Sequence, residues 1–296
     1  MSKKIVTVQD ISCYGGCSTT VALPIISHYG IECAILPSAI LSTHTSGFKN
    51  FTVLDLTDEM PKIINHWIDE NIKFDAIYTG YIGDVRQFDL ILKMKDKLLK
   101  ENGLFIVDPA MADNGKMYPA LKEDIQIGMR KIVRVADYVI PNITEACFLT
   151  NTEYKEEFTM AEYQELVSKL YQMGAKNVIL TGIRDYDSIG AMGFDGITRC
   201  TIFKEYRTKC YHGTGDIFSS IIVSDIVNGK PLKDAIDHAC EFVGVAIDNT
   251  MNDDSHPYGV KFEEILESEL KSHKDILEED ENTISLDPSL EKRIED

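Results

Sequence analysis

The chain has 296 residues, and its 48 acidic and 30 basic residues leave a formal net charge of −18. Its length allows a large core, and a hydrophobic fraction of 44% indicates a folded globular chain rather than a disordered one. The negative charge argues against nucleic acid or an anionic membrane as a partner, because both would require a basic surface.

Short apolar runs alternate with amphipathic segments, which is typical of an α/β protein. The first half predicts, in order, a strand at 4–8, a helix at 19–30, a strand at 33–37, a helix at 57–72, a strand at 75–80 and a helix at 85–102. The next segment predicts a strand at 104–109, a helix at 118–134, a strand at 137–142, a helix at 159–173 that opens with a capping box, and a strand at 177–182. Two β-like runs at 190–194 and 199–204 predict a hairpin or an edge pair, and helices are expected at about 216–228, 231–249 and 261–272. This order predicts a three-layer α/β/α sandwich with a mostly parallel central sheet.

We expect a single domain over residues 1–274. The segment 275–296 is polar and dense in charge, and we expect it to be partly disordered or lightly docked. Residues 262–296 contain 13 acidic and 4 basic side chains, which is half of the net charge of the chain.

The seven cysteines stand at positions 13, 17, 33, 147, 200, 210 and 240, and none of them forms a Cys-x-x-Cys motif. This usage indicates reduced thiols rather than a disulfide framework or a structural zinc site. No apolar run approaches the ~20 residues needed to cross a bilayer, and the N-terminal run is too short for a signal peptide. We therefore expect a cytoplasmic protein.

Polar residues and glycines follow five of the expected strands, where ligands bind in open α/β sheets. They are Gln9 with Asp10, residues 79–84, Asp108, Asn142 with Glu145, and Thr181 with Gly182. Their recurrence at successive strand ends predicts a ligand site at that edge of the sheet.

The stretch Gly213-Thr214-Gly215-Asp216 precedes an apolar helix. The first N–H groups of a helix have no partner within it, and the positive end of the helix dipole lies behind them, so this stretch suits a transferred phosphoryl group. Asp216 in the first turn could accept a proton from an attacking hydroxyl. The alternative from these residues alone is a capped turn whose carboxylate only complements the dipole.

Three active-site motifs of other α/β protein classes are missing from the sequence. It contains no Gly-x-x-x-x-Gly-Lys-[Ser/Thr], no Gly-x-Gly-x-x-Gly after the first strand and no Gly-x-Ser-x-Gly. These absences argue against a P-loop NTPase, a dinucleotide oxidoreductase and an α/β-hydrolase.

Five segments together resemble the ribokinase-like superfamily and, within it, the pyridoxal kinase group. They are "STHTSGF" (42–48), "TGYIGD" (79–84), "VDPAMADNGKMY" (107–118), "PNITEACFLT" (141–150) and "HGTGDIFSS" (212–220), and the resemblance extends from about residue 5 to residue 267. It implies a ribokinase-like fold and ATP-dependent phosphorylation of the hydroxymethyl group of a vitamin B6 vitamer.

The resemblance also implies roles for individual residues. Asp216 would be the catalytic base, and the backbone amides of Gly213, Thr214 and Gly215 would stabilise the transferred phosphoryl group. The residues implied to bind ATP are Asp108, Asn142, Thr181, Asp113 and Lys116, the last two in a flap over the nucleotide. Asp108 and Glu145 would hold Mg²⁺, and Asp10, Thr45 and Tyr81 would contact the substrate. A homodimer is implied as well, and a requirement for K⁺ stays open.

The turn after the first strand departs from the group's pattern, because Asp10-Ile11-Ser12 stands where members commonly carry Ser-His-Val. A carboxylate at position 10 could pair with a protonated ring nitrogen or with an amine of the substrate. The alternatives are a hydroxymethylpyrimidine kinase, a kinase for another small alcohol, and a nucleotide-binding regulatory protein without turnover.

Overall fold

The computed structural model describes residues 2–45, 47–119, 121–207, 211–251, 253 and 258–270. The chain divides into two compact units, Met1–Val260 and Lys261–Asp296. In the second unit residues 263–270 are helical, in agreement with the first part of the helix expected at 261–272. The acidic tail predicted at 275–296 lies outside the described residues.

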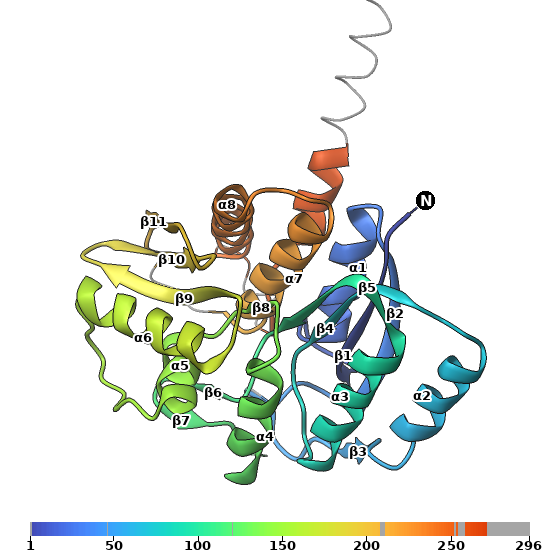
Figure 1. The fold of residues 1–296 in the computed structure, drawn as a ribbon. Coiled ribbons are helices and arrows are strands. Elements are labelled where there is room, and N and C mark those ends of the chain that lie inside the picture. Colours follow the sequence, from blue (N-terminus) through green and yellow to red (C-terminus); the bar gives the residue numbers. More distant parts are fainter. Residues whose placement is uncertain are drawn as a thin grey trace, which may run out of the picture. The chain divides into compact units, whose positions relative to one another are not determined.

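The first unit is built on a nine-stranded sheet with the strand order β11-β10-β9-β8-β5-β4-β1-β2-β3 (Figure 1). The strands are β1 (Lys4–Ser12), β2 (Glu32–Leu41), β3 (Val53–Asp55), β4 (Phe74–Thr79), β5 (Leu99–Val107), β8 (Tyr138–Val139), β9 (Asn177–Asp185), β10 (Ser188–Phe194) and β11 (Arg199–Glu205). The six central strands from β2 to β9 pair in parallel, whereas β3 at one edge and β10 and β11 at the other are antiparallel. The hairpin predicted from the two β-like runs is therefore confirmed.

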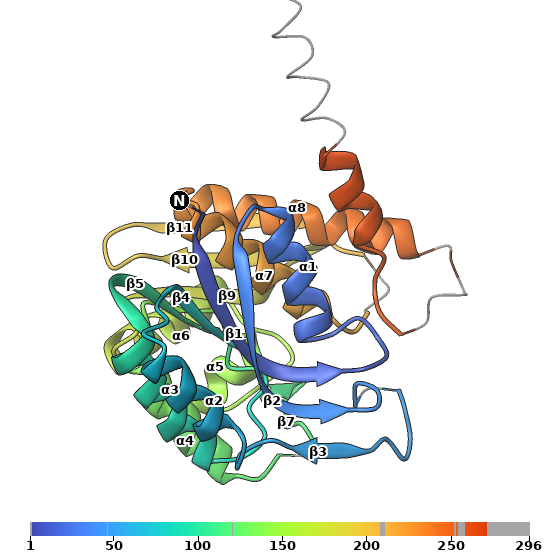
Figure 2. The same ribbon diagram turned by 90° about the vertical axis from the view of Figure 1, so that its right-hand side faces the viewer.

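Helices cover both faces of this sheet (Figures 1 and 2). One layer contains α1 (Thr19–His28), α7 (Thr214–Val227) and α8 (Leu232–Thr250). The other contains α2 (Met60–Asp69), α3 (Arg86–Leu98), α4 (Asp124–Val133), α5 (Ile143–Thr150) and α6 (Met160–Met173). This arrangement confirms the predicted three-layer α/β/α sandwich with a mostly parallel sheet. Within the described ranges, no helix is long and apolar enough to span a bilayer.

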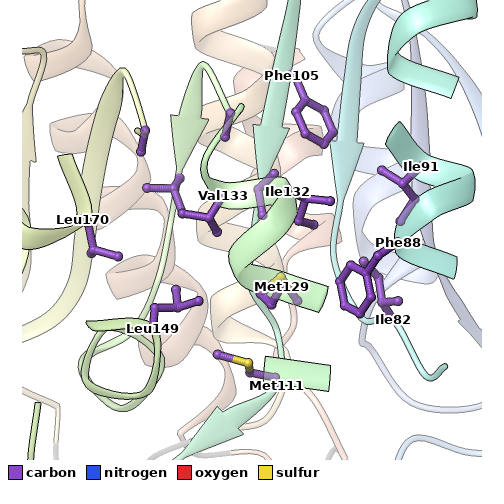
Figure 3. Packing of buried hydrophobic residues seen from close by; sticks show 14 of the residues in the cluster. Ile82, Phe88, Ile91, Phe105, Met111, Met129, Ile132, Val133, Leu149 and Leu170 are labelled. Atoms are coloured by element: carbon purple, nitrogen blue, oxygen red, sulfur yellow. The ribbon is translucent and has the colours of Figure 1, made fainter. Parts of the chain in front are cut away.

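The core under α3 and α4 explains why these amphipathic segments are helical. On α4, Ile125, Met129, Ile132 and Val133 recur at helical spacing, and all of them are buried. Figure 3 shows Met129, Ile132 and Val133 in the same packed region as Phe88 and Ile91 of α3 and Phe105 of β5. Burial of these faces fixes both helices on the sheet.

Two predicted helix boundaries are wrong. The helix expected over 85–102 ends at Leu98, because Leu99 enters β5 and pairs with Phe74, while Lys100 donates to Asp75 over 2.9 Å. The helix expected over 118–134 begins only at Asp124. At residues 99–102, contacts with distant parts of the chain override the local helical pattern. Before Asp124 the backbone bonds locally instead, from the N–H of Tyr118 to the oxygen of Met111 and from the N–H of Leu121 to the oxygen of Tyr118.

Candidate active site

A cavity of about 370 Å³ lies where β5, β8 and β9 end and α7 begins. Most of the catalytic, nucleotide and metal residues predicted from the sequence line it. They are Asp108, Asp113, Asn142, Glu145, Thr181, Gly213, Thr214, Gly215 and Asp216. Residues that follow separate strands thus meet in one cavity, as expected for parallel strands whose carboxyl ends share an edge.

Four predicted site residues are not among those that line this cavity. Lys116 is exposed on the short strand β7 (Lys116–Met117). Asp10 and Tyr81 lie at the ends of β1 and β4, and Thr45 is half-buried beside His44. The structure thus separates the cavity from a second group of predicted residues around the turn after β1.

The start of α7 has the geometry of an anion site. Gly213 is its N-cap, with a left-handed φ of 84°. A Cβ at this position would lie 2.0 Å from the carbonyl oxygen of Gly16, so only glycine fits here. At Gly215, by contrast, a Cβ would meet no atom within 4 Å, so this position of the helix start, which lines the cavity, is uncrowded.

Asp216 connects this helix start with the turn after β1. Its Oδ2 accepts the backbone N–H of Ser18 over 3.0 Å, while the residue also lines the cavity. Burial of the carboxyl group raises the pKa of Asp216 to about 6; the Ser18 amide lowers it and the charge of Asp10 raises it. The group is therefore ionised at neutral pH but more basic than an ordinary aspartate, as a general base requires.

Two buried carboxylates lie behind the helix start. Asp108 is 8% exposed and accepts the hydroxyl of Ser219 over 2.6 Å. Glu145 is 3% exposed and accepts the backbone N–H groups of Met111 and Asn142 over 3.1 and 2.9 Å. Burial raises the pKa of both carboxyls; the charge of Asp216 raises that of Asp108 further, and the charge of Asp108 raises that of Glu145. A divalent cation would offset this electrostatic cost, so the two buried carboxylates suit one.

The available metal-ligating side chains also limit how a divalent cation can be bound. Among the described residues there is no cluster of three or more metal-ligating side chains. Mg²⁺ is typically bound by one or two carboxylates together with phosphate oxygens and water, so Asp108 and Glu145 suit it. Because both oxygens of Glu145 already accept backbone N–H groups, Glu145 suits a water-mediated contact.

The predicted flap is a two-stranded hairpin of β6 (Ala112–Asp113) and β7. The backbone oxygen of Ala112 accepts Nδ2 of Asn142 over 2.8 Å, and the N–H of Gly115 donates to Oγ1 of Thr144 over 3.0 Å. Asn142 also caps α5 in a capping box with Glu145, so its side chain joins the flap to the start of that helix. The mobility of the flap stays a prediction.

A second group of residues surrounds Asp10, which is only 3% exposed. Burial raises the pKa of Asp10, and hydrogen bonds from Ser18 and Ser12 lower it. Burial raises the pKa of Tyr81 to about 12, with a smaller contribution from the charge of Asp10. Asp10 therefore lies close enough to act electrostatically on both Tyr81 and Asp216.

Aromatic side chains lie beside the turn after β1. The rings of Phe48 and Tyr258 are stacked with centroids 4.0 Å apart, and His44 lies edge-on to Phe48 at 5.0 Å. The imidazole Nε2 of His44 is 3.0 Å from the backbone oxygen of Tyr258. Such a group suits contact with a planar aromatic ring.

Sequence reasoning assigned no role to Ser18, Ser219, Phe48 or Tyr258. A site position for Ser219 could have been predicted, because it follows Asp216 by three residues and so lies on nearly the same face of α7. Ser18 had none, since its contact with Asp216 joins residues 198 positions apart.

The start of α7 combines glycines with a carboxylate of raised pKa, and two buried carboxylates lie behind it at the strand ends of an α/β/α sandwich. This arrangement defines a phosphotransferase of the ribokinase-like superfamily. The chain belongs to the phosphomethylpyrimidine kinase family, whose model matches residues 13–260. Membership of this family makes it a kinase with an alcohol group as acceptor.

Relatives with different substrates are similarly close. The chain is 26% identical over 243 residues to the pyridoxal kinase of Dictyostelium discoideum, with 75% of this chain and 78% of that protein covered. It is also 26% identical over 258 residues to a hydroxymethylpyrimidine/phosphomethylpyrimidine kinase of Haemophilus influenzae, with 84% and 93% covered. A Bacteroides thetaiotaomicron structure named for phosphomethylpyrimidine kinase and solved with pyridoxal has 34% identity and a TM-score of 0.86, covering 90% and 96% of the two chains.

Proposed function

We propose that the protein transfers the γ-phosphoryl group of ATP to the hydroxymethyl group of a vitamin B6 vitamer. The observation that carries this proposal is the position of Asp216. It lines the cavity that contains the predicted phosphate and cation residues, and it is hydrogen-bonded to Ser18 in the turn that follows β1, the strand of the predicted substrate residue Asp10. A proton acceptor between the cavity and the turn after β1 can take the proton of an alcohol on one side while a phosphoryl group lies on the other.

The proposed reaction is an in-line displacement. Asp216 accepts the proton of the attacking hydroxyl, while Ser18 keeps the carboxylate oriented through its backbone N–H. The first N–H groups of α7, at Thr214 and Gly215, stabilise the negative charge that develops on the transferred group. No atom lies within 4 Å of the Cβ position of Gly215, so the proposed phosphoryl site is uncrowded at this residue.

Asp108 and Glu145 would hold Mg²⁺, which neutralises phosphate charge when it is bound. The Ser219 hydroxyl orients Asp108, and the backbone N–H groups of Met111 and Asn142 orient Glu145. Asn142 and Thr181, which pair through an isolated β-bridge, line the cavity beside these carboxylates and would contact the nucleotide phosphates. Asp113 in the flap would cover them, and Lys116 on the same hairpin would supply positive charge.

The substrate ring would lie against Tyr81, with Asp10 and Thr45 on its polar edge. A buried carboxylate at position 10 is suited to a protonated ring nitrogen or an amine, since a positive partner would offset its desolvation. The solved Bacteroides thetaiotaomicron relative, which contains pyridoxal, supports a B6 vitamer as the substrate.

A hydroxymethylpyrimidine kinase is the second candidate, and the family description together with the Haemophilus influenzae relative favours it. Both substrates are aromatic nitrogen heterocycles with a hydroxymethyl group. The chemistry of phosphoryl transfer is therefore shared, and only the acceptor distinguishes the two candidates.

A panel of acceptors tests the proposal. ADP release is measured with pyridoxal, pyridoxamine, pyridoxine, hydroxymethylpyrimidine and no acceptor, each with ATP and Mg²⁺. We expect the largest kcat/KM with one of the three B6 vitamers. A preference for hydroxymethylpyrimidine would replace the proposal with the second candidate. Nucleotide binding without turnover on any acceptor would support a regulatory protein instead.

A further inference from the structure

The active-site cavity continues beyond the phosphate residues along one face of α8. Cys240, Val243, Gly244 and Ile247 line this part, at the three- and four-residue spacing of one helix face. Ile189 of β10 lines it as well. The lining that α8 and β10 contribute is apolar, which suits a planar base better than a phosphate.

Two cations, Lys204 and Arg207, also line the cavity. Lys204 pairs with Asp237 and Glu241, each over 2.9 Å, and the guanidinium group of Arg207 is held in place by three hydrogen bonds. Its Nε and Nη2 donate to the two carboxylate oxygens of Asp248 over 3.1 and 2.8 Å, and Nη1 donates to the backbone oxygen of Glu205 over 2.7 Å. The group packs on α8 at Gly244, where a Cβ would come within 3.3 Å of Cζ. The side chain of Arg207 is 23% exposed.

The pairing of Arg207 with Asp248 determines which part of a nucleotide Arg207 can bind. A bidentate carboxylate neutralises the guanidinium charge, so this end of the cavity does not attract an anion as the start of α7 does. The planar guanidinium group keeps its ability to stack on an aromatic ring and to donate hydrogen bonds in its own plane. A neutral aromatic base can stack on the guanidinium plane and can also accept its hydrogen bonds.

We propose that Arg207, oriented by Asp248, binds the nucleotide base and so contributes to the recognition of ATP. This inference rests on the proposed kinase function and adds the residue that contacts the base. Gly244 is part of the same arrangement, because a Cβ at this position would crowd the guanidinium group at 3.3 Å and shift it by a few tenths of an ångström.

The test compares Arg207→Ala with Arg184→Ala as a matched control. Arg184 belongs to the same edge of the sheet, and its guanidinium lies over the ring of Tyr206 with Cζ 4.7 Å from the centroid, but it does not line the cavity. We expect Arg207→Ala to raise the KM for ATP about tenfold, which corresponds to about 1.4 kcal/mol, with kcat and the KM for the alcohol unchanged. Arg207→Lys should not restore the wild-type KM, because an ammonium group has no planar fork. Asp248→Asn should raise the KM in the same direction, and Arg184→Ala should leave it unchanged.

Calorimetry with ADP and with inorganic tripolyphosphate separates base binding from phosphate binding. We expect Arg207→Ala to weaken ADP binding about tenfold and to leave tripolyphosphate binding unchanged. Equal losses for both ligands, or no loss for ADP, would overturn the base assignment and leave the proposed kinase function intact. If the wild-type protein failed to bind ADP at all, the proposed function and the base site would both be wrong.

Discussion

Two glycines at the start of α7 have different neighbours, so alanine at each position should affect a different property of the protein. Gly213 has a positive φ, and its virtual Cβ collides with the backbone of the turn after β1. Gly215 lies within the helix, and its virtual Cβ points into open space. We therefore predict that Gly213→Ala loses stability, whereas Gly215→Ala retains stability and loses activity.

The expected loss of stability at Gly213 has two sources. A left-handed conformation costs an ordinary residue about 1 kcal/mol. The Cβ would also lie 2.0 Å from the carbonyl oxygen of Gly16, and because this oxygen belongs to the backbone, the turn itself must move. Overpacking of this kind costs about 2 kcal/mol. The sum of about 3 kcal/mol lowers the melting temperature by about 6–12 °C in a domain of this size.

The expected loss of activity at Gly215 comes from the space that a methyl group would occupy. Alanine is a better helix former than glycine, so the melting temperature should stay within about 2 °C of the wild type or rise. Gly215 lines the cavity, so an added methyl group would take up space beside the proposed phosphoryl site. A displacement of about 1 Å in the reacting groups lowers turnover by about 10²-fold.

Thermal unfolding and steady-state kinetics of the two variants give the comparison. A wild-type melting temperature for Gly213→Ala would contradict the contact between Gly213 and the Gly16 turn. Wild-type turnover for Gly215→Ala would mean that the phosphoryl group does not lie at the start of α7, and the proposed reaction geometry would then be wrong.

Three further predictions concern carboxylates around the reacting hydroxyl. Asp216→Asn should lower kcat by about 10²–10⁴-fold while ADP binding, measured by calorimetry, stays at the wild-type value; near-wild-type turnover would refute the role of Asp216 as base. Only the ionised carboxylate accepts a proton, so log(kcat/KM) of the wild type should fall by about one per pH unit below the raised pKa of about 6, and a profile flat down to pH 4.5 would argue against this base. Asp10→Ser should change the ratio of kcat/KM values for pyridoxal, pyridoxamine and pyridoxine, and an unchanged ratio would exclude Asp10 from ring recognition.

The sheet and the nucleotide side of the site were predictable from local patterns. Asp108 and Asn142 each follow a short apolar run, and Thr181 ends a third one. Consecutive parallel strands bring their carboxyl ends to one edge, so three separate positions in the sequence imply one site. The structure brings these residues together in one cavity.

The contacts that orient the proposed base were not predictable in this way. The hydrogen bond from Ser18 to Asp216 depends on the packing of two turns from opposite ends of the chain. The stacking of Phe48 on Tyr258 likewise joins distant segments. No spacing rule links such positions, because these contacts are a consequence of the assembled sheet.

Residues 99–102 show the same limitation within a single element. Their sequence continues the amphipathic helix that precedes them, yet they form the first part of β5. Pairing of Leu99 with Phe74 and the bond from Lys100 to Asp75 decide the outcome, and neither partner is evident from the local pattern.

Identification of the product tests the central claim most directly. The protein is incubated with ATP, Mg²⁺ and each B6 vitamer, and the product is analysed by ³¹P NMR and mass spectrometry, with the Asp216→Asn variant as the control. We predict a new phosphate monoester on the hydroxymethyl group of a vitamer, formed by the wild type and nearly absent with the variant. Equal amounts of the ester from both proteins would contradict the role of Asp216, and hydrolysis of ATP without any vitamer ester would contradict the proposed function.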